Sequence, residues 1–325
     1  FDSKQTGLPH NTIYSIIHTK DNQIYIGTYN GLCRYVQASG KFENILLPVN
    51  RGGSNLFVNS LLEDTTRQCI WIGMEGYLFQ YNPTIGEMKA IEVFHNNSIK
   101  SLALDGDENL LAGTDNGLYV YQNDKEPLQH IIHDSRNIQS LTNNIIWNIF
   151  SDQEHNIWLG TDYGISLSRY NSALQFVPIS QITGTGDGNQ FYSLFRDSKG
   201  FYWFGGTNGV IRFTHPAGNK HDAIWYRMGD KNHPLSHNRI RHIYEDREQQ
   251  LWIATDGSIN RYDYNTHQFV HYNIVDSTGT YNTNWAYYLF EDTDGKLWIA
   301  TCLGGIFVVD KHKLIQSAGR SFNNE

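Results

Sequence analysis

The stretch IWLGTDYGISL at residues 157–167 occurs, with small changes, at seven places along this 325-residue chain. The other six copies are IYIGTYNGLCRY at 24–35, IWIGMEGYLFQY at 70–81, LLAGTDNGLYVY at 110–121, YWFGGTNGVIRF at 202–213, LWIATDGSINRY at 251–262 and LWIATCLGGIFV at 297–308. Each copy joins a short apolar run to a turn and then to a second apolar run. Such regular repetition indicates a fold built from one repeated supersecondary unit.

A small residue in each copy gives a fixed point for measuring the period. These residues are Gly27, Gly73, Gly113, Gly160, Gly205, Ala254 and Ala300. The successive steps are 46, 40, 47, 45, 49 and 46 residues. A period in the forties, with strand-like content and no helical periodicity, is typical of propeller blades made of four strands. The sequence therefore predicts an all-β fold, a seven-bladed β-propeller with four-stranded antiparallel blades.

We expect the whole chain, 1–325, to form this one propeller. The expected blades lie near 7–50, 51–94, 95–137, 138–182, 183–231, 232–276 and 277–316. A ring of sheets leaves exposed edges unless its first and last blades are joined. We therefore expect residues 1–6 to lie beside blade seven and to supply or extend its outer strand. Residues 317–325 are expected to be a linker stub or to compete for that same edge.

The second strand of each blade is expected to be almost continuously apolar, because both faces of a propeller sheet are covered by neighbouring blades. Five copies carry a tryptophan in this strand: Trp71, Trp158, Trp203, Trp252 and Trp298. We expect these indoles to fill the widening gap between blades. The glycine or alanine two places later is expected to make room for them.

Composition excludes several classes of function. The formal net charge of -8 and the lack of any basic run argue against a nucleic-acid partner. The chain has no long apolar run and no export-signal pattern, so we expect no direct membrane insertion by this segment, which can still be part of a longer exported or anchored protein. Cys33, Cys69 and Cys302 form no CxxC pair and are expected to be small buried residues. No metal site and no cofactor is expected.

Candidate ligand contacts come from the first strand of each blade, counted back from the turn that follows it. The residues five places before the turn aspartate, or its equivalent, are Tyr14, Asn59, Lys100, Trp147, Tyr192, Arg241 and Tyr287. The next residue in each strand is Ser15, Ser60, Ser101, Asn148, Ser193, His242 or Tyr288. These positions are expected to surround one mouth of the central channel. Aromatic rings stack on sugar faces and polar groups bond hydroxyls or a uronate, so the first ring and His242 are predicted ligand contacts.

Two further aromatic residues are candidates outside the rings. Trp225 lies in the stretch 214–238, which also holds Arg227 and is expected to project from the rim after blade five. Trp285 stands just before the first strand of blade seven. Trp225 can contact a ligand, the second propeller or a dimer partner, whereas Trp285 is either an exposed ligand contact or a staple of the strand that follows it.

Several stretches carry a resemblance to a known family. GLPHNTIYSI, SLTNNIIWNIFSD and PLSHNRIRHIYED, each followed by a stretch of the LWI(G/A)T type, resemble the two-component regulator propeller repeat. Repeats of this family build the periplasmic sensor region of hybrid two-component systems in Bacteroides-type bacteria. Blades two and three depart most, because WIGMEGYL lacks the threonine and LLAGT lacks the tryptophan.

The resemblance implies a function that periodicity does not show. In that family two seven-bladed propellers precede a small β-sandwich, a membrane helix and cytoplasmic kinase and regulator modules. This chain would then be the amino-terminal propeller, a periplasmic part of a membrane-anchored receptor for signal transduction and transcription regulation. The expected ligand is an oligosaccharide, and the expected partners are the second propeller, the β-sandwich and a second copy in a homodimer. The fragment is expected to have no enzymatic activity, whereas the full-length protein would carry a histidine kinase.

Two other classes of function stay open at this point. A propeller glycosidase or lyase is the enzymatic alternative, but glycoside hydrolysis ordinarily needs two carboxylates, and the fourteen ring residues contain none. Acidic residues on rim loops, such as Asp187 and Asp276, leave this alternative open. A purely structural or dimerisation propeller is the third class.

Overall fold

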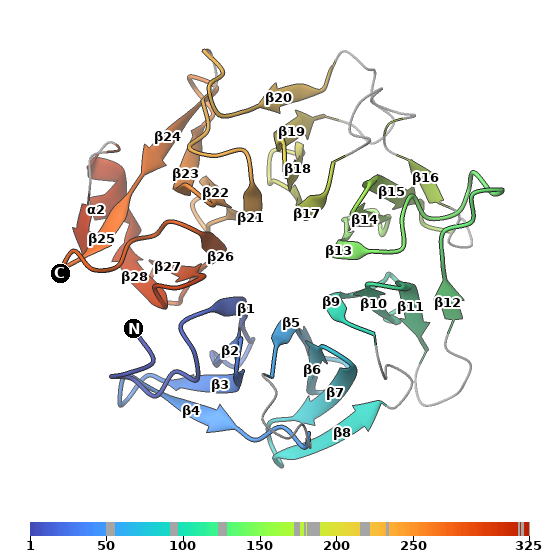
Figure 1. Ribbon diagram of the computed structural model, residues 1–325, viewed down its shortest axis with the longest axis horizontal. Helices are drawn as coiled ribbons and strands as arrows, with labels where there is room; N and C mark the ends of the chain where they lie inside the picture. Colours follow the sequence, from blue (N-terminus) through green and yellow to red (C-terminus); the bar gives the residue numbers. More distant parts are fainter. Residues whose placement is uncertain are drawn as a thin grey trace.

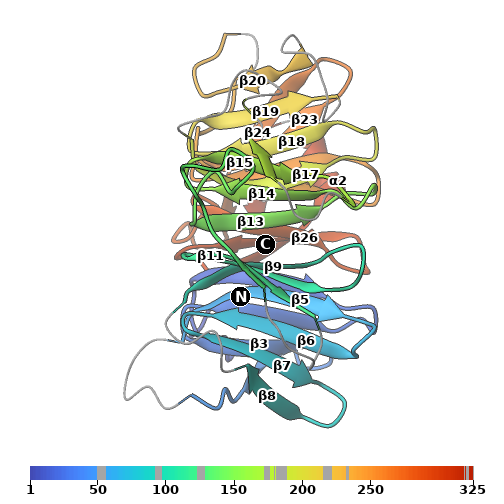
Figure 2. The ribbon, with the colours of Figure 1, turned by 90° about the vertical axis from the view of Figure 1, so that its right-hand side faces the viewer.

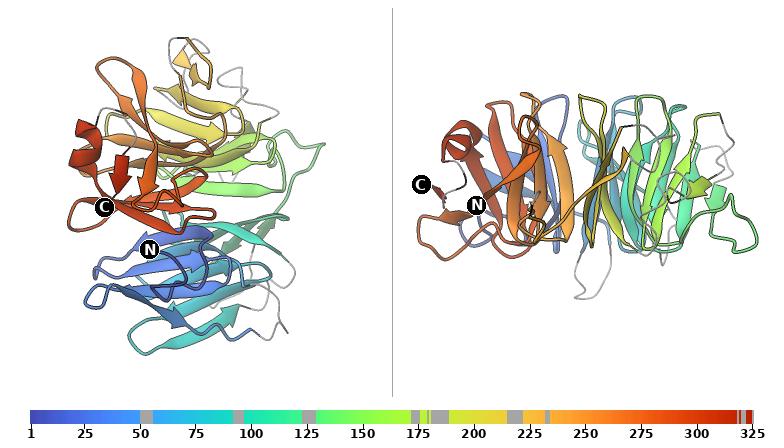
Figure 3. Two further views of the ribbon diagram at one scale, coloured as in Figure 1. Left: turned by 60° about the vertical axis from the view of Figure 1, so that its left-hand side comes forward. Right: turned by 90° about the horizontal axis from the view of Figure 1, so that it is seen from above.

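The computed structural model describes residues 1–49, 56–91, 97–122, 129–171, 176–178, 180, 189–214, 222–231, 234–317, 319 and 322–324. Seven antiparallel sheets stand around a central axis, each with its first strand at the centre and its last strand at the rim (Figure 1). Seen from the side the molecule is a disc (Figure 2), and the sheets stand next to one another around it (Figure 3). The predicted seven-bladed β-propeller is confirmed.

The strands of the first three blades are short and follow one another in space as in sequence. Blade one contains β1 (Ile13–His18), β2 (Ile24–Thr28), β3 (Gly31–Val36) and β4 (Lys41–Ile45). Blade two contains β5 (Val58–Asp64), β6 (Cys69–Met74), β7 (Tyr77–Asn82) and β8 (Glu87–Ile91). Blade three contains β9 (Ile99–Leu104), β10 (Leu110–Thr114), β11 (Gly117–Tyr121) and β12 (Gln129–Ile131).

The next three blades repeat this order. Blade four contains β13 (Ile146–Ser151), β14 (Ile157–Thr161), β15 (Gly164–Ser168) and β16 (Phe176–Pro178). Blade five contains β17 (Phe191–Arg196), β18 (Tyr202–Gly206), β19 (Gly209–Phe213) and β20 (Ile224–Tyr226). Blade six contains β21 (Ile240–Glu245), β22 (Leu251–Thr255), β23 (Ser258–Asp263) and β24 (Gln268–Tyr272).

Blade seven differs in its outer position. Its sheet contains β26 (Ala286–Glu291), β27 (Lys296–Thr301) and β28 (Ile306–Asp310). Phe1 pairs with the first residue of β28, since its nitrogen donates to the Ile306 carbonyl at 2.7 Å and its carbonyl accepts from the Ile306 N–H at 3.0 Å. Residues 2–6 then turn toward blade one, where the Thr6 carbonyl accepts from the N–H of Phe42. Within 1–6, only Phe1 forms backbone hydrogen bonds with β28 in the part of the chain that the structure describes.

Residues 311–316 and 322–324 fold back on blades six and seven, where the sequence predicts that 317–325 form a linker stub or compete for the outer edge of blade seven. Helix α2 (Lys311–Gln316) follows β28 directly, and β29 (Phe322–Asn324) pairs in parallel with β25 (Ile274–Asp276). The Lys311 ammonium is buried and lies 2.7 Å from Glu291 and 3.4 Å from Asp246. This ion cluster holds helix α2 at the boundary between blades six and seven, because a buried ammonium needs nearby carboxylates.

Tryptophans of the second strands form the core between blades, as predicted. Trp71, Trp158, Trp203 and Trp252 are fully buried, and Trp298 is nearly so. Each indole N–H also donates to the aspartate that starts the preceding turn, at 2.8 Å for Trp158 and Asp152. The other oxygen of Asp152 accepts two backbone N–H groups of that turn. One carboxylate therefore ties the turn to the core of the blade.

The small residue of the second strand does not make room for this tryptophan, so that expectation was wrong. A Cβ on Gly205 would lie 2.4 Å from Ile240, the first residue of the next blade's inner strand, and one on Gly73 would lie 2.6 Å from Ile99. Ala254 has the same place in blade six, and the next blade begins with the small Ala286 in the same core cluster. The glycine therefore accommodates the neighbouring blade, because the inner strands approach most closely there.

Blades two and three keep the fold despite their altered repeats. Leu111 replaces the tryptophan of blade three and is fully buried, while Asp105 receives a 2.9 Å hydrogen bond from the side chain of Asn109. Met74 replaces the threonine of blade two and is buried. Blade five has Gly206 at this place, whereas in the remaining five blades the threonine closes the next turn, as when Thr161 donates to the Gly164 carbonyl at 2.8 Å.

Candidate functional site

A β-bulge near the start of each inner strand builds the candidate site. In blade five, Phe191 pairs with Gly206 and Ser193 pairs with Gly205, which leaves Tyr192 between them without a partner on β18. The same shift occurs in every blade. The seven unpaired residues are Tyr14, Asn59, Lys100, Trp147, Tyr192, Arg241 and Tyr287. A bulge re-aims a side chain without ending the strand, and here it does so seven times around one axis.

All seven bulge residues line one pocket of about 440 Å³ at a mouth of the central channel. The sequence therefore placed these residues together correctly, and the structure adds Phe57, Glu75 and Ser98 to the wall. The volume lies in the range of small-molecule sites, which is about 300 to 1,000 Å³. The geometry thus brings one side chain from each blade to a single concave surface.

On one side of the mouth, a chain of hydrogen bonds fixes two aromatic rings. The Trp147 indole N–H donates to Asp162 at 3.0 Å, and the Gln190 amide donates to the same carboxylate oxygen at 2.6 Å. The Tyr192 hydroxyl donates to the Gln190 side-chain oxygen. The two rings are perpendicular, with 5.3 Å between their centroids. The rings of Trp147 and Tyr192 are therefore held in a fixed perpendicular arrangement.

Arg241 is held on the other side by Asp256. Its guanidinium donates to both carboxylate oxygens, at 2.6 and 3.1 Å, while its carbon lies 4.5 Å from the centroid of Tyr287. Such a two-point contact fixes the plane of the guanidinium. Its charge is largely offset by Asp256, so Arg241 acts at the mouth mainly as an oriented donor.

The remaining members complete the ring. The Lys100 ammonium lies 4.7 Å from the centroid of Trp147 and 3.5 Å from the Ser98 hydroxyl. The Asn59 amide donates to the Ile99 carbonyl at 3.0 Å, which leaves its oxygen as the acceptor. Tyr14 and Tyr287 stack across the boundary between blades one and seven, with centroids 6.4 Å apart. The mouth therefore offers flat rings, donors and acceptors around one space.

The mouth tyrosines keep their protons at neutral pH. Burial raises the pKa of Tyr287 to about 12, although nearby Arg241 opposes this effect. Burial also raises the pKa of Tyr14 and of Tyr192. Their hydroxyls are therefore uncharged at neutral pH, and that of Tyr192 donates to Gln190.

The residue after each bulge has a different task, which is to join neighbouring blades. The Ser193 hydroxyl accepts from the Ile243 N–H at 2.9 Å, and the Asn148 side chain accepts from the Leu194 N–H at 3.3 Å. Ser60 and Ser101 bond the next blade in the same way. We call these residues the second ring. They line the channel of about 760 Å³ below the mouth.

His242 belongs to this second ring and not to the mouth pocket. Its Nδ1 accepts from the Leu289 N–H of blade seven at 3.2 Å, and its ring stacks on Tyr288 with centroids 3.9 Å apart. Burial lowers its pKa to about 3, so the ring is neutral at physiological pH. These contacts give His242 a position between blades six and seven, where it serves as an acceptor.

The two tryptophans expected near the rim lie in different surroundings. Trp225 is on β20, half-buried against the core of blades four and five, with the Arg227 guanidinium 4.3 Å from its centroid. Trp285 is 49% exposed just ahead of β26 and has a left-handed backbone with φ 55°. Neither residue lines the mouth pocket. Of the loop acids, Asp187 is outside the described residues, and Asp276 lies on β25 near the rim (Figure 1).

Three acidic residues near the mouth were missed by the reasoning from sequence. Glu75, Asp162 and Asp256 occupy the same repeat position, directly after the second strand. Counting two residues beyond the small residue of the second strand, Gly73, Gly160 or Ala254, would have identified them. Within the described ranges, no group of three or more histidine, cysteine or acidic residues is placed to hold a metal ion. No helix in those ranges is long and apolar enough to cross a membrane.

The repeats match a known protein family, and the chain is similar to solved structures. The family described as two component regulator propeller matches residues 7–30, 140–163, 185–208, 234–257 and 280–302. The chain is similar to the extracellular domain of BT4673 from B. thetaiotaomicron, a proposed hybrid two-component system, with 82% identity and a TM-score of 0.52. A second structure of that domain, named there as part of a proposed one-component system, is 81% identical with the same TM-score. Both alignments cover 100% of this chain and 44% of the other.

More distant likeness shows the fold alone. A streptogramin B lyase structure has a TM-score of 0.67 with 13% identity, covering 93% of this chain and 95% of the lyase. No curated protein matches this chain.

Proposed function

The chain belongs to the two component regulator propeller family, and we propose that it is the ligand-sensing propeller in the extracellular region of a membrane-anchored hybrid two-component receptor. The support is the 82% identity with an extracellular domain of a system of that kind. The chain spans 44% of that domain. The kinase, the regulator and the transcriptional output therefore belong to the proposal for a longer protein.

We propose an oligosaccharide as the ligand, bound at the mouth pocket. The observation that carries this proposal is the convergence of seven bulge residues, one from each blade, on one concave surface. Trp147 and Tyr192 offer flat rings for the apolar faces of a pyranose. Arg241, Lys100 and Asn59 offer donors and acceptors for hydroxyl groups.

The charges of the mouth favour a neutral or weakly acidic sugar. Asp256 offsets Arg241, and Asp162 accepts hydrogen bonds from Trp147 and Gln190. A strongly charged ligand would have to compete with these internal partners. A neutral sugar keeps them in place and adds hydrogen bonds around them.

The proposed role is non-enzymatic. Hydrolysis of a glycoside ordinarily uses one carboxylic acid and one carboxylate on either side of the scissile bond. Asp162 and Asp256 are instead committed to holding Trp147 and Arg241. The resemblance to a lyase is one of fold and carries no residue of its chemistry to this chain.

Contact with another protein on the mouth face is the second candidate function. Trp285 is 49% exposed and Leu303 is 63% exposed, and the Cys302 N–H bonds the Trp285 carbonyl, which brings these two loops together. Tryptophan is enriched among the anchor residues of protein interfaces, and Leu303 extends the apolar surface beside it. We propose the second propeller or a second copy of the chain as the partner of this surface, with the β-sandwich following in the same receptor.

Calorimetric titration with defined neutral and acidic plant and host oligosaccharides tests the proposed ligand. We expect one member of the set to bind residues 1–325, and Trp147→Ala to weaken its binding by at least about tenfold, which corresponds to about 1.4 kcal/mol. Trp225→Ala is the matched control, because this tryptophan lies away from the mouth. Equal weakening by both changes, or no binding by a folded protein across the set, would contradict a site at the mouth of this propeller.

A further inference from the structure

The boundary between blades six and seven carries two strained residues at the mouth face. Ser258 has a left-handed backbone with φ 83° at the place where blade four has Gly164. Trp285 is left-handed too, with φ 55°, and its backbone N–H donates to the Asp256 carbonyl at 3.1 Å. Residues with a Cβ keep this conformation only where the surrounding structure holds them in it. The mouth end of this boundary is therefore held under strain.

A column of side chains runs along the same boundary from the mouth into the channel. At the mouth, the Arg241 guanidinium lies 4.5 Å from the centroid of Tyr287. The next residues of the two strands, His242 and Tyr288, stack with their centroids 3.9 Å apart. The His242 ring also stacks on Tyr244, with 6.4 Å between the centroids. All five side chains line the channel, so each contact leads directly to the next.

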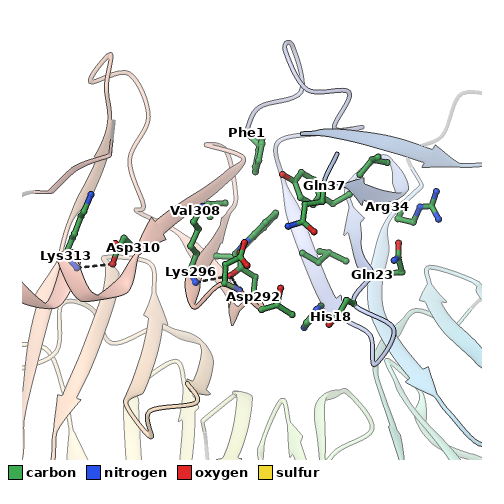
Figure 4. A pocket seen from close by; sticks show the side chains of 17 residues that line it. Phe1, His18, Gln23, Arg34, Gln37, Asp292, Lys296, Val308, Asp310 and Lys313 are labelled. Carbon is green, nitrogen blue, oxygen red and sulfur yellow. Dashed lines mark hydrogen bonds between the residues drawn. The ribbon is translucent and has the colours of Figure 1, made fainter. Parts of the chain in front are cut away.

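The column ends at the ion cluster that holds helix α2. The Tyr244 hydroxyl accepts from the Glu291 N–H at 3.1 Å, and the Glu291 carboxylate lies 2.7 Å from the Lys311 ammonium. Asp310 caps the same helix, because its carboxylate accepts the Lys313 N–H at 3.2 Å (Figure 4). Helix α2 is therefore attached to the residue at which the column ends.

The column is not a simple consequence of the repeat. In blade four, Asn148 and Phe150 stand at the places of His242 and Tyr244. The Asn148 side chain still accepts from the Leu194 N–H of the next blade. A phenyl ring at the second place has no hydroxyl oxygen to accept an N–H. The contacts that continue toward the far end of the channel therefore depend on the particular residues of blades six and seven.

We propose that the boundary between blades six and seven is a conformational coupling element, in which the arrangement of Arg241 and Tyr287 at the mouth determines whether helix α2 stays docked at the far end of the channel. Coupling of this kind requires an element with two arrangements that both ends bias. In the docked arrangement Lys311 is buried among carboxylates, and in the released arrangement it is hydrated.

The ion cluster suits such a balance between two arrangements. The cost of removing an ammonium and its carboxylates from water offsets much of their mutual attraction, so docking of Lys311 is not strongly favoured by charge alone. A change in the column can therefore shift the balance. Coupling is reciprocal, so loss of the docked helix should also loosen the inner strand of blade seven. This inference needs no ligand and stands apart from the proposed oligosaccharide.

Acetylation of two lysines of helix α2 measures docking within a single peptide. Lys311 is buried and Lys313 is exposed, so Lys313 is an internal reference for the reagent. Residues 1–325 are treated with succinimidyl acetate, and mass spectrometry gives the rate at Lys311 relative to that at Lys313. Release of the helix raises this ratio, because it exposes the Lys311 ammonium to the reagent.

Two variants perturb the column, and each has a matched control at the same repeat position of another blade. Tyr287→Ala acts at the mouth end, and Tyr192→Ala removes the same side chain from the mouth ring of blade five. His242→Ala acts within the column and removes the acceptor of an N–H of the next blade. Asn148→Ala removes the equivalent acceptor between blades four and five.

The column variants and their controls should differ in the acetylation ratio. We expect the ratio to rise at least about fivefold in His242→Ala and about threefold in Tyr287→Ala, and to stay within about twofold of the parent in both controls. An unchanged ratio in both column variants would overturn the proposal. Equal rises in the column variants and in their controls would overturn it too, because they would indicate general loosening of the propeller.

Lys311→Met tests the reverse direction. This change removes the docking charge, and we expect hydrogen exchange in β26 (Ala286–Glu291) to become at least about threefold faster while exchange in β13 (Ile146–Ser151) stays within about twofold of the parent. The same change in exchange for both strands, or no change in either, would contradict coupling between helix α2 and the mouth.

Discussion

Arg241 and His242 are neighbours in the chain, yet they belong to two regions with opposite tasks. Arg241 is the bulge residue of its strand and lines the mouth pocket, whereas His242 points to blade seven and accepts a hydrogen bond from Leu289. Trp147 and Asn148 divide the same two tasks in blade four. The bulge thus lets one strand present a side chain to the mouth while the next residue holds the ring of blades closed.

The two rings should therefore respond differently to substitution. The mouth ring varies among aromatic, amide and basic side chains, because its members face an open space and each other. The second ring consists mainly of small acceptors that must meet a particular N–H of the next blade. Loss of an acceptor leaves that N–H buried and unpaired, whereas water can replace a partner at the mouth.

The largest expected effect comes from the close contact between Gly205 and Ile240, the residue ahead of the bulge in the next blade. Gly205→Ala places a methyl group against Ile240, and overpacking of this kind costs about 1 to 3 kcal/mol. Ile240→Ala alone opens a cavity at a cost of about 2 to 5 kcal/mol. We expect the double variant to lose clearly less than the sum, because it reproduces the Ala254 and Ala286 pair of the next seam.

Urea unfolding of the two single variants and the double variant checks this expectation. Simple additivity of the losses in free energy would contradict the assignment of the glycine to the neighbouring blade.

The next largest expected effect is a difference in stability between variants of the two rings within blade five. Ser193→Ala removes the acceptor of the Ile243 N–H and should lower the free energy of unfolding by about 1 to 3 kcal/mol. Tyr192→Phe removes a hydroxyl at the mouth, where water can serve Gln190, and should cost less than about 1 kcal/mol. Urea titrations of both variants make the comparison. If Tyr192→Phe proved the more destabilising change, the proposed division of tasks would be wrong.

A smaller expected effect is a loss of folding stability at acid pH, which depends on His242. Its pKa is lowered to about 3 in the folded protein, so between that value and about 6.5 the unfolded chain binds more protons. Stability from this residue is therefore present at neutral pH and is lost on acidification, by about 1 to 2 kcal/mol at pH 5. His242→Asn keeps an acceptor, as Asn148 does in blade four, and should lose less stability between pH 7.5 and pH 5.

Unfolding midpoints in urea at the two pH values measure this difference. The same loss in the variant and in the parent would show that His242 is not the group responsible.

The sequence predicted the blade number, the core tryptophans and the members of the mouth ring, because each depends on a position that recurs seven times. It did not predict the bulges, which are visible only when the partner of each strand residue is known. It also gave the wrong reason for Gly205, since the atom that needs the space is in the following blade.

Other features depend on contacts between distant segments and have no local signal. Lys311 meets Glu291 and Asp246 only after blades six and seven are side by side, so the helix after β28 was not expected. His242 was grouped with the mouth residues because its side chain suits a ligand site, whereas its neighbours Leu289 and Tyr288 determine its position between blades.

Calorimetric titration of two variants with the tightest-binding oligosaccharide of the set tests the claim that the bulge ring, and not the second ring, contacts the ligand. Arg241→Ala should weaken binding by at least about tenfold while the protein stays folded, and His242→Asn should leave the affinity within about twofold of the parent. Weakening by His242→Asn as great as that by Arg241→Ala, or no weakening by either, would contradict the claim.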